Sequence, residues 1–135
     1  MRVVIDTHVL ISGLLNPDGA PARVLDLVLR GNLTLLYDNR LLSEYREVMY
    51  RDKFSFTTDT VEPLLEYIAS EGEYVVPEPH PAIFRDEDDR GFFEVAKSGG
   101  AAFLITGNRA RYPADRIIKT PVEFLASYRR KRRRR

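Results

Sequence analysis

Short apolar runs alternate with amphipathic stretches along most of the chain. The runs are rich in β-branched and aliphatic residues, as expected for strands buried on both faces of a sheet. We expect strands at residues 3–5, 33–37, 73–76, 102–106 and 116–119. We expect helices over 21–30, 40–51 and 88–98, from 59 onward, and from 121 to 128. This alternation predicts an α/β fold with a parallel sheet covered by helices on both faces.

Turn and capping residues mark the ends of these elements. Residues 13–19 (GLLNPDG) are expected to form a turn-rich loop, and residues 77–81 (PEPHP) an exposed connection. Asp59 with Glu62 resembles an acidic capping box at the start of a helix. The last helix is expected to be capped by Thr120, Pro121 and Glu123.

The length of 135 residues and the hydrophobic content of 44% suit one compact domain. No apolar run approaches the roughly 20 residues of a membrane-spanning helix, and the first apolar run is too short for a secretory signal. The chain has no cysteine, so a metal site must use oxygen or imidazole ligands. These features favour a cytoplasmic protein without a membrane anchor.

The net charge of +1 conceals a strong asymmetry. Residues 129–135 carry seven of the 21 Lys and Arg residues, which leaves 14 basic and 20 acidic groups, a net charge of −6, before them. An acidic body with a basic tail suits a metal-dependent enzyme that acts on a polyanion. We therefore divide the chain into a domain over 1–128 and a basic tail over 129–135. The tail is expected to be disordered, and whether it binds RNA stays open.

Asp6 follows the first apolar run directly, at the carboxyl end of an expected strand. Ligands of open α/β sheets bind at that end of the strands. A buried carboxylate is unfavourable there unless it binds a metal or accepts hydrogen bonds. Asp6 is therefore either the floor of a metal-binding pocket or the cap of the following turn, and the sequence leaves both interpretations open.

Further carboxylates are expected at the same edge of the sheet. Glu44 lies near the amino end of the helix after the second strand, and Asp86, Asp88 and Asp89 cluster where the helix before the 102–106 strand begins. Several carboxylates in one cleft repel one another unless cations neutralise them, and Mg²⁺ or Mn²⁺ prefers such oxygen ligands. Taken singly, however, each of these acids also suits a solvated surface or a helix cap.

Four segments resemble, in order and spacing, motifs of the toxin branch of the PIN-domain family: IDTHVLISGLL, LLSEYREVM, DEDDRGFFEVAKSGGAAFLITGNRARYP and KTPVEFL. The resemblance implies a three-layer α/β/α fold with a parallel sheet of about five strands. It also implies a ribonuclease that uses Mg²⁺ or Mn²⁺ to cut single-stranded RNA, is neutralised by a cognate antitoxin protein and forms a homodimer. Matched position by position, the catalytic acids are Asp6, Glu44 and Asp89, with Asp86 as a further metal ligand.

Two positions depart from the family pattern. His8 stands where the family has the Asn of D-T-N, and Asn108 stands where many members have a fourth acid after T-G. Imidazole is a poorer ligand than oxygen for Mg²⁺, and an asparagine carbonyl supplies no charge. We treat His8, Asp88, Thr106 and Asn108 as accessory residues; the Thr106 hydroxyl lies beside the site or bonds to a turn. The departures leave open a PIN-like domain that binds RNA or a partner and has weak or no catalysis.

The chemistry expected of the carboxylates is hydrolysis of a phosphodiester by metal-activated water. No side chain is required to act as a covalent nucleophile. Arginines that flank the acidic motifs are candidates for binding the RNA backbone. They are Arg85, Arg90, Arg109 and Arg111.

Other classes of protein share parts of this pattern. A haloacid-dehalogenase-like phosphatase also has an Asp after its first strand, but it needs a second acid where this chain has His8. A phospho-receiver domain needs an Asp at the end of its middle strand, for which Asp38 is a weak candidate. Both would form an aspartyl phosphate. A structural adaptor leaves the acidic residues unexplained.

Overall fold

The computed structural model describes residues 1–133. One parallel sheet of five strands, in the order β3-β2-β1-β4-β5, forms its centre. The strands are β1 (Arg2–Ile5), β2 (Thr34–Tyr37), β3 (Glu73–Tyr74), β4 (Phe103–Ile105) and β5 (Ile118–Lys119). The sheet confirms the predicted α/β fold class and the parallel arrangement.

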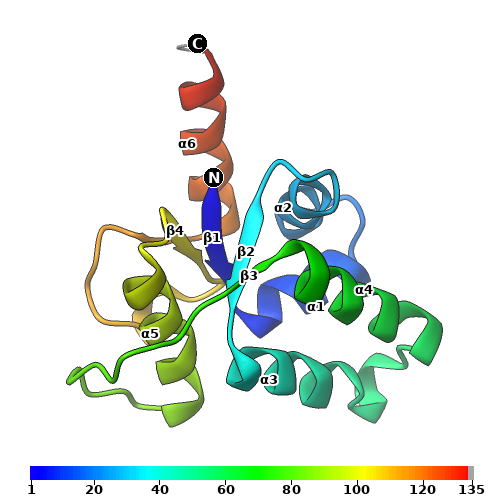
Figure 1. Ribbon diagram of the computed structural model, residues 1–135. Helices are drawn as coiled ribbons and strands as arrows, with labels where there is room; N and C mark the ends of the chain where they lie inside the picture. Colours follow the sequence, from blue (N-terminus) through cyan, green and yellow to red (C-terminus); the bar gives the residue numbers. More distant parts are fainter. Residues whose placement is uncertain (134–135) are drawn as a thin grey trace.

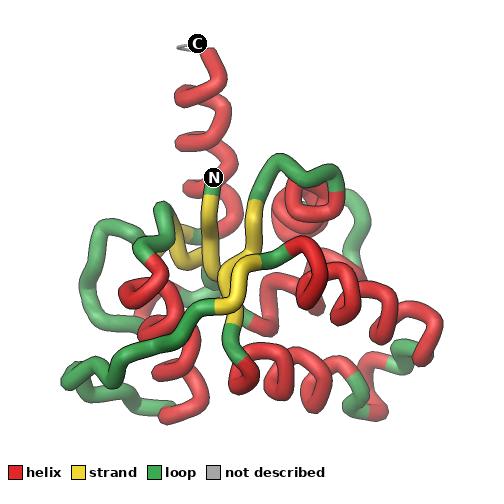
Figure 2. The backbone as a smooth tube through the Cα atoms, in the orientation of Figure 1, coloured by secondary structure: helices red, strands yellow, loops and turns green. Residues whose placement is uncertain are grey.

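Helices cover both faces of this sheet. They are α1 (Thr7–Leu15), α2 (Ala20–Leu29), α3 (Asn39–Met49), α4 (Thr58–Glu71), α5 (Arg90–Gly99) and α6 (Pro121–Arg133), with short 3₁₀ turns η1 (Asp52–Phe54), η2 (Glu87–Asp89) and η3 (Arg109–Arg111). Figure 1 views the sheet nearly edge-on, with α5 on one side and α1, α2 and α4 on the other. The same three layers are visible in the tube drawing of Figure 2. Within residues 1–133, no helix is long and apolar enough to span a membrane.

β1 lies in the middle of the sheet and of the hydrophobic core. Val3, Val4 and Ile5 are fully buried because β2 and β4 flank the strand and α5 packs across one face. This position explains why the strand is a continuous apolar run without alternation. It also fixes the backbone of the next residue, Asp6, whose amide donates to the Ile105 carbonyl at 3.1 Å.

α1 occupies part of the segment that we expected to be a loop. The helix begins directly after Asp6, whose carboxylate accepts a hydrogen bond from the Val9 amide at 3.3 Å. Gly13 lies inside the helix, where α1 and α2 pack closely: an added Cβ would lie 3.1 Å from the Pro21 carbonyl oxygen. The predicted loop over residues 13–19 is therefore wrong for residues 13–15, because Gly13 permits close helix packing and does not form a turn.

The start of α4 also differs from the prediction. The helix begins at Thr58, so Asp59 lies in its first turn and does not cap it. Glu62 cannot complete a capping box because its carboxylate pairs with Arg46 of α3 at 2.6 Å. The expected apolar face is nevertheless buried against the core. Its residues are Val61, Leu64, Leu65 and Ile68.

α6 has the predicted capping box but a later end. The Thr120 amide donates to the Glu123 carboxylate at 2.9 Å, and the Glu123 amide donates to the Thr120 hydroxyl at 3.2 Å. The helix continues beyond residue 128 to Arg133. Arg and Lys favour helix, and their charges are favourable near a helix carboxyl end. Residues 129–133 are therefore helical, residues 134–135 lie outside the described residues, and the division at residue 128 stays a prediction.

Candidate active site

The carboxyl ends of β1 and β4 form the centre of the candidate site. The chain places β2 and β3 on one side of β1, and β4 and β5 on the other. The strand order therefore reverses between β1 and β4, and ligands of open α/β sheets bind at such a point. Asp6 follows β1 and Thr106 follows β4, so these two residues face each other across the reversal.

Asp6 is buried, with 3% of the residue exposed. Its carboxylate accepts hydrogen bonds from the Thr106 hydroxyl and from the Val9 amide. Burial raises the pKa of Asp6, whereas these two hydrogen bonds and the charge of Arg111 lower it. The Thr106 hydroxyl also accepts a hydrogen bond from the Asn108 amide at 3.1 Å, so it binds both the Asp6 carboxylate and the backbone of the following turn. Asp6 is therefore a helix cap and a buried acid at the site floor at once.

Asp89, the last residue of η2, is the second buried acid, also with 3% exposed. It forms an ion pair with the Arg111 Nη2 at 2.7 Å and accepts a hydrogen bond from the Arg111 Nε at 3.1 Å. Burial and the neighbouring charges of Asp86 and Asp88 raise the pKa of Asp89, while Arg111 lowers it. The guanidinium of Arg111 thus acts electrostatically on both buried acids, Asp6 and Asp89.

Tyr112 contributes a hydroxyl to the same region. The residue is buried, and its hydroxyl oxygen has no hydrogen-bond partner among the described residues. Burial raises the pKa of this phenol well above its usual range, and the charges of Asp6 and Asp89 raise it further. An unpartnered hydroxyl beside two buried acids is a polar group available to a water or ligand. Tyr112 is not among the predicted site residues, because the aromatic residue in RARYP resembles an ordinary core residue.

Glu44 belongs to a second acidic group on the same side of the molecule. Its side chain lines a pocket of about 240 Å³ with Arg40, Glu87 and Asp88. Burial raises the pKa of Glu44, and the charges of Asp88, Glu47 and Asp86 raise it further. The structure therefore brings Glu44 to the exposed acids that begin η2. The exposed Asp86 caps that turn by accepting a hydrogen bond from the Asp88 amide at 2.9 Å.

These residues provide part of a ligand set for a divalent cation. Within residues 1–133, no three His, Asp or Glu side chains lie close enough together to hold a metal ion alone. Asp6 and Asp89 still fit a hydrated Mg²⁺ or Mn²⁺, because Mg²⁺ commonly binds through one or two carboxylates and keeps several waters. Two observations support this fit: both acids lie within electrostatic reach of one group, Arg111, and are therefore near each other, and the nearby Tyr112 hydroxyl lacks a partner.

His8 and Asn108, the two departures from the family pattern, have different surroundings. His8 is exposed in the first turn of α1, and its charge lowers the pKa of Asp6. The Asn108 side chain caps η3 by accepting a hydrogen bond from the Ala110 amide at 3.1 Å. Asn108 therefore shapes the loop that presents Arg111, while His8 lies at the open side of the site.

Three of the four arginines predicted to bind RNA make contacts within the protein. Arg111 binds Asp89, and Arg109 pairs with Glu123 at 3.2 Å. Arg90 pairs with Glu87 and donates to the carbonyls of His80 and Ala82. Arg85 is exposed and forms no ion pair with any residue of the described chain. Arg85 is therefore the member of this set most accessible to a ligand.

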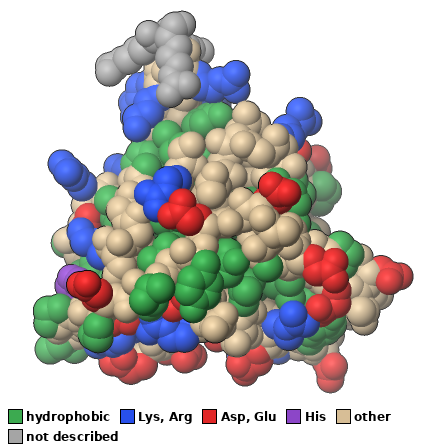
Figure 3. Space-filling view, viewed as in Figure 1, with side chains coloured by type: hydrophobic (Ala, Val, Ile, Leu, Met, Phe, Trp, Pro, Cys, Tyr) green, Lys and Arg blue, Asp and Glu red, His purple; other side chains and the backbone are tan. Residues whose placement is uncertain are grey.

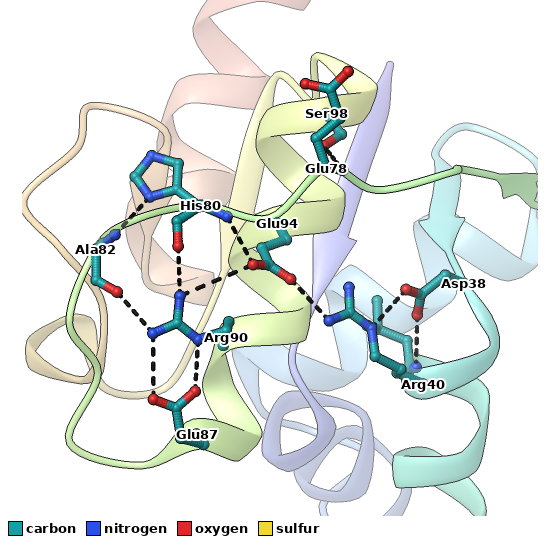
Figure 4. Close-up of polar contacts among 10 residues, drawn as sticks. Asp38, Arg40, Glu78, His80, Ala82, Glu87, Arg90, Glu94 and Ser98 are labelled. Atoms are coloured by element: carbon teal, nitrogen blue, oxygen red, sulfur yellow. Dashed lines mark hydrogen bonds and ion pairs between the residues drawn. The ribbon is translucent and has the colours of Figure 1, made fainter.

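A network of charged side chains, absent from the predicted site residues, holds the segment that leads to Asp89 (Figure 4). Arg40 of α3 lies between Asp38, at 2.9 Å, and the buried Glu94 of α5, at 2.8 Å. The Glu94 carboxylate also accepts a hydrogen bond from the His80 amide at 2.8 Å. Burial raises the pKa of Glu94, but these hydrogen bonds outweigh it and lower the pKa overall. The network ties α3, α5 and the 77–89 segment together, which fixes the direction from which Asp89 enters the site.

The sequence model of the PIN domain matches residues 2–110. A protein of Methanocaldococcus jannaschii that is described as uncharacterized is 30% identical over 112 residues, covering 81% of this chain and 72% of the relative. No solved structure gives a significant match.

Proposed function

Because this chain belongs to the PIN-domain family, we propose that it is a divalent-metal-dependent endoribonuclease that cuts single-stranded RNA. PIN domains are generally nucleases and usually use divalent metal ions. The observation that carries the proposal is the pair of buried acids, Asp6 and Asp89, beside the reversal of strand order. Burial raises the pKa of both carboxyl groups, and buried acids in such a position are typical of functional sites.

Asp6 and Asp89 would hold Mg²⁺ or Mn²⁺, with Glu44 and Asp86 as further ligands. When bound, such an ion lowers the pKa of a water and stabilises negative charge on a phosphate. The Thr106 hydroxyl keeps the Asp6 carboxylate oriented by donating to it. No side chain needs to act as a covalent nucleophile in this scheme.

We also propose that the protein is the toxin of a toxin–antitoxin pair, acts in the cytoplasm as a homodimer, and is neutralised by a cognate antitoxin. This part of the proposal rests on the resemblance of the four sequence segments to the toxin branch of the family. It is tested by expression with and without a co-expressed antitoxin candidate, scored by growth. Unchanged growth on expression of the chain alone would contradict the toxin role but not the nuclease activity.

A second candidate is a PIN-like domain that binds RNA or a partner and cuts weakly or not at all. Three observations favour it. Arg111 pairs with Asp89, the Asn108 side chain is used in a turn, and His8 replaces an oxygen ligand. Each of these reduces the negative charge or the number of oxygen ligands available to a cation.

The experiment that separates the two candidates is cleavage of single-stranded RNA in Mn²⁺, in Mg²⁺ and in EDTA. The wild-type protein is compared with Asp6→Asn, in which the amide oxygen can still cap α1. Asp26→Asn is the matched control, because Asp26 makes an exposed pair with Arg30 on α2, away from the site. We expect cleavage by the wild type and the control, and none by Asp6→Asn or in EDTA.

Metal-dependent cleavage that is retained in Asp6→Asn would overturn the site assignment. RNA binding without cleavage under any condition would instead support the binding-only domain. Incubation with acetyl phosphate, followed by mass measurement, tests the phosphatase and receiver alternatives, because those proteins form an aspartyl phosphate. We expect no mass increase, in keeping with the family of this chain.

A further inference from the structure

The basic end of α6 lies at the opposite edge of the sheet from the acidic site. α6 begins beside the carboxyl end of β5 and runs back along the sheet, and its last turns extend beyond the body of the protein (Figure 1). Lys and Arg side chains surround this extension in Figure 3, whereas Asp and Glu side chains are visible along the lower edge of the same face. Cationic side chains therefore gather at this extension, whereas both signs of charge are visible lower on the same face.

Residues 129–132 of this extension are all cationic. They are Arg129, Arg130, Lys131 and Arg132. All four are exposed, and none forms an ion pair with a carboxylate within residues 1–133. Two of them contact aromatic rings: the Lys131 Nζ lies 5.6 Å from the Phe103 ring centre, and the Arg132 guanidinium carbon lies 5.9 Å from that of Tyr128. Their charges are therefore positioned by the helix and remain available to an external anion.

A pocket of about 450 Å³ lies where this extension meets the loop between α2 and β2. Its lining combines cations with an aromatic ring and contains no carboxylate. The lining residues are Met1, Gly31, Asn32, Tyr128, Lys131 and Arg132. The Tyr128 ring is held by stacking on Phe124, with ring centres 5.8 Å apart and planes inclined by 28°. The pocket is thus a preformed recess with an aromatic wall and two cations at its edge.

We propose that this pocket, the α6 pocket, binds single-stranded RNA, with Lys131 and Arg132 on the phosphates and Tyr128 against a base. Proteins that bind single strands combine a basic groove with aromatic side chains on which bases stack. A protein partner with an acidic surface would need the cations but not the aromatic wall. The ligand class rests on the proposed ribonuclease function. The α6 pocket then adds a contact near the carboxyl end of α6, a 13-residue helix about 20 Å long.

The α6 pocket is tested by binding, not by cleavage, so that it can fail independently of the nuclease proposal. The full chain carrying Asp6→Asn is titrated with a fluorescent 12-nucleotide single-stranded RNA in EDTA, and anisotropy is followed over a range of salt concentrations. The test variant is Lys131→Gln with Arg132→Gln. The matched control is Arg129→Gln with Arg130→Gln, which removes two charges from the same helix outside the pocket lining.

We expect the pocket variant to weaken RNA binding about tenfold and to reduce the slope of log K against log salt by about 1.4, the value for two lost phosphate contacts. The control should change binding by less than about threefold. Tyr128→Leu should weaken binding about fivefold or more through lost stacking, with the salt slope unchanged. Thermal unfolding checks that each variant is folded.

If the pocket variant and the control weaken RNA binding equally, the proposal that the α6 pocket binds RNA is wrong. The basic helix would then attract RNA only through its overall charge. Equally tight binding of a polyglutamate of matched charge would overturn the RNA assignment and point to an acidic protein partner. Cleavage by the wild-type protein bears on neither result. Failure of the nuclease proposal and failure of the α6 pocket are therefore distinguishable.

Discussion

Arg111 holds Asp89 through an ion pair of 2.7 Å and a second hydrogen bond of 3.1 Å, inside the candidate active site. The same guanidinium lowers the pKa of Asp6, so one side chain compensates two buried acids. A divalent cation bound between these acids would occupy a region where a positive charge is already present. Arg111 is therefore expected to oppose metal binding and to stabilise the metal-free protein.

The substitution Arg111→Gln should strengthen Mn²⁺ binding about tenfold, because it removes the competing charge. It should also lower the unfolding temperature in EDTA, because Asp89 would then be buried without its partner. Both quantities are accessible by isothermal titration calorimetry and thermal unfolding. Arg109→Gln is the control, since it removes the same charge from the same turn but from an exposed pair with Glu123. Equal Mn²⁺ affinities of wild type and Arg111→Gln would contradict the competition.

Removing the Tyr112 hydroxyl should have the opposite effect on stability from removing the hydroxyl of a typical core tyrosine. Because this hydroxyl is buried without a protein partner, Tyr112→Phe should stabilise the metal-free protein by about 1 kcal/mol. Tyr45→Phe should destabilise it by about 1 kcal/mol, because the Tyr45 hydroxyl donates to the Ile5 carbonyl at 2.6 Å. Urea unfolding in EDTA measures both. Destabilisation by Tyr112→Phe would mean that a water or ion satisfies the hydroxyl.

The fold was largely predictable from the sequence because the strands are buried on both faces. Such strands must be continuous apolar runs, and the run 3–5 and the segment AFLIT carry that signal clearly. α1 was not predicted, because a glycine such as Gly13 suggests a turn as readily as a close contact between helices. The contact that gives Gly13 its role comes from Pro21 and exists only after α1 and α2 pack.

The candidate site was predictable only as a set of acids near one edge of the sheet. Family motifs select Asp6 and Asp89, but nothing local shows that Arg111, 22 residues away, pairs with Asp89. Glu94 resembles a solvated helix residue, and its partner Arg40 lies 54 residues earlier in the chain. Ion pairs of this kind depend on how the helices cross, which hydrophobic periodicity does not determine.

Because Arg40 pairs with the buried Glu94, replacing Arg40 should destabilise the protein more than replacing Arg46, another arginine of α3. Arg40→Met should destabilise the protein by about 2 kcal/mol, because it leaves the buried Glu94 carboxylate with only the longer 3.9 Å ion pair to Arg90. That remaining pair and the half-exposed Arg40 place the loss below the value for a fully buried pair. Arg46→Met, which breaks the more exposed pair with Glu62, should cost less than about 1 kcal/mol. Denaturant unfolding compares the two. Equal losses would mean that the network around Glu94 adds no stability.

The pH dependence of stability should differ in sign between Asp6 and Glu94. The pKa of Asp6 is raised in the folded protein, so its contribution favours folding at low pH and becomes unfavourable as the pH rises through the folded pKa. Asp6→Asn should therefore stabilise the metal-free protein more at about pH 7 than at about pH 4. The pKa of Glu94 is lowered, so its contribution is present above the ordinary glutamate pKa and is lost as the pH falls through the folded pKa.

Glu94→Gln should consequently destabilise the protein at about pH 7, and this loss should shrink toward about pH 4. Thermal unfolding of wild type and both variants in EDTA, at the two pH values, gives the two differences. Added Mn²⁺ should reverse the effect of Asp6→Asn at about pH 7, because only the carboxylate of the wild type holds the ion with its full charge. If Asp6→Asn is less stable than wild type in EDTA at that pH, the Thr106 and Val9 hydrogen bonds outweigh the burial of the charge. Asp6 would then be chiefly a structural cap, and the site assignment would rest on Asp89 alone.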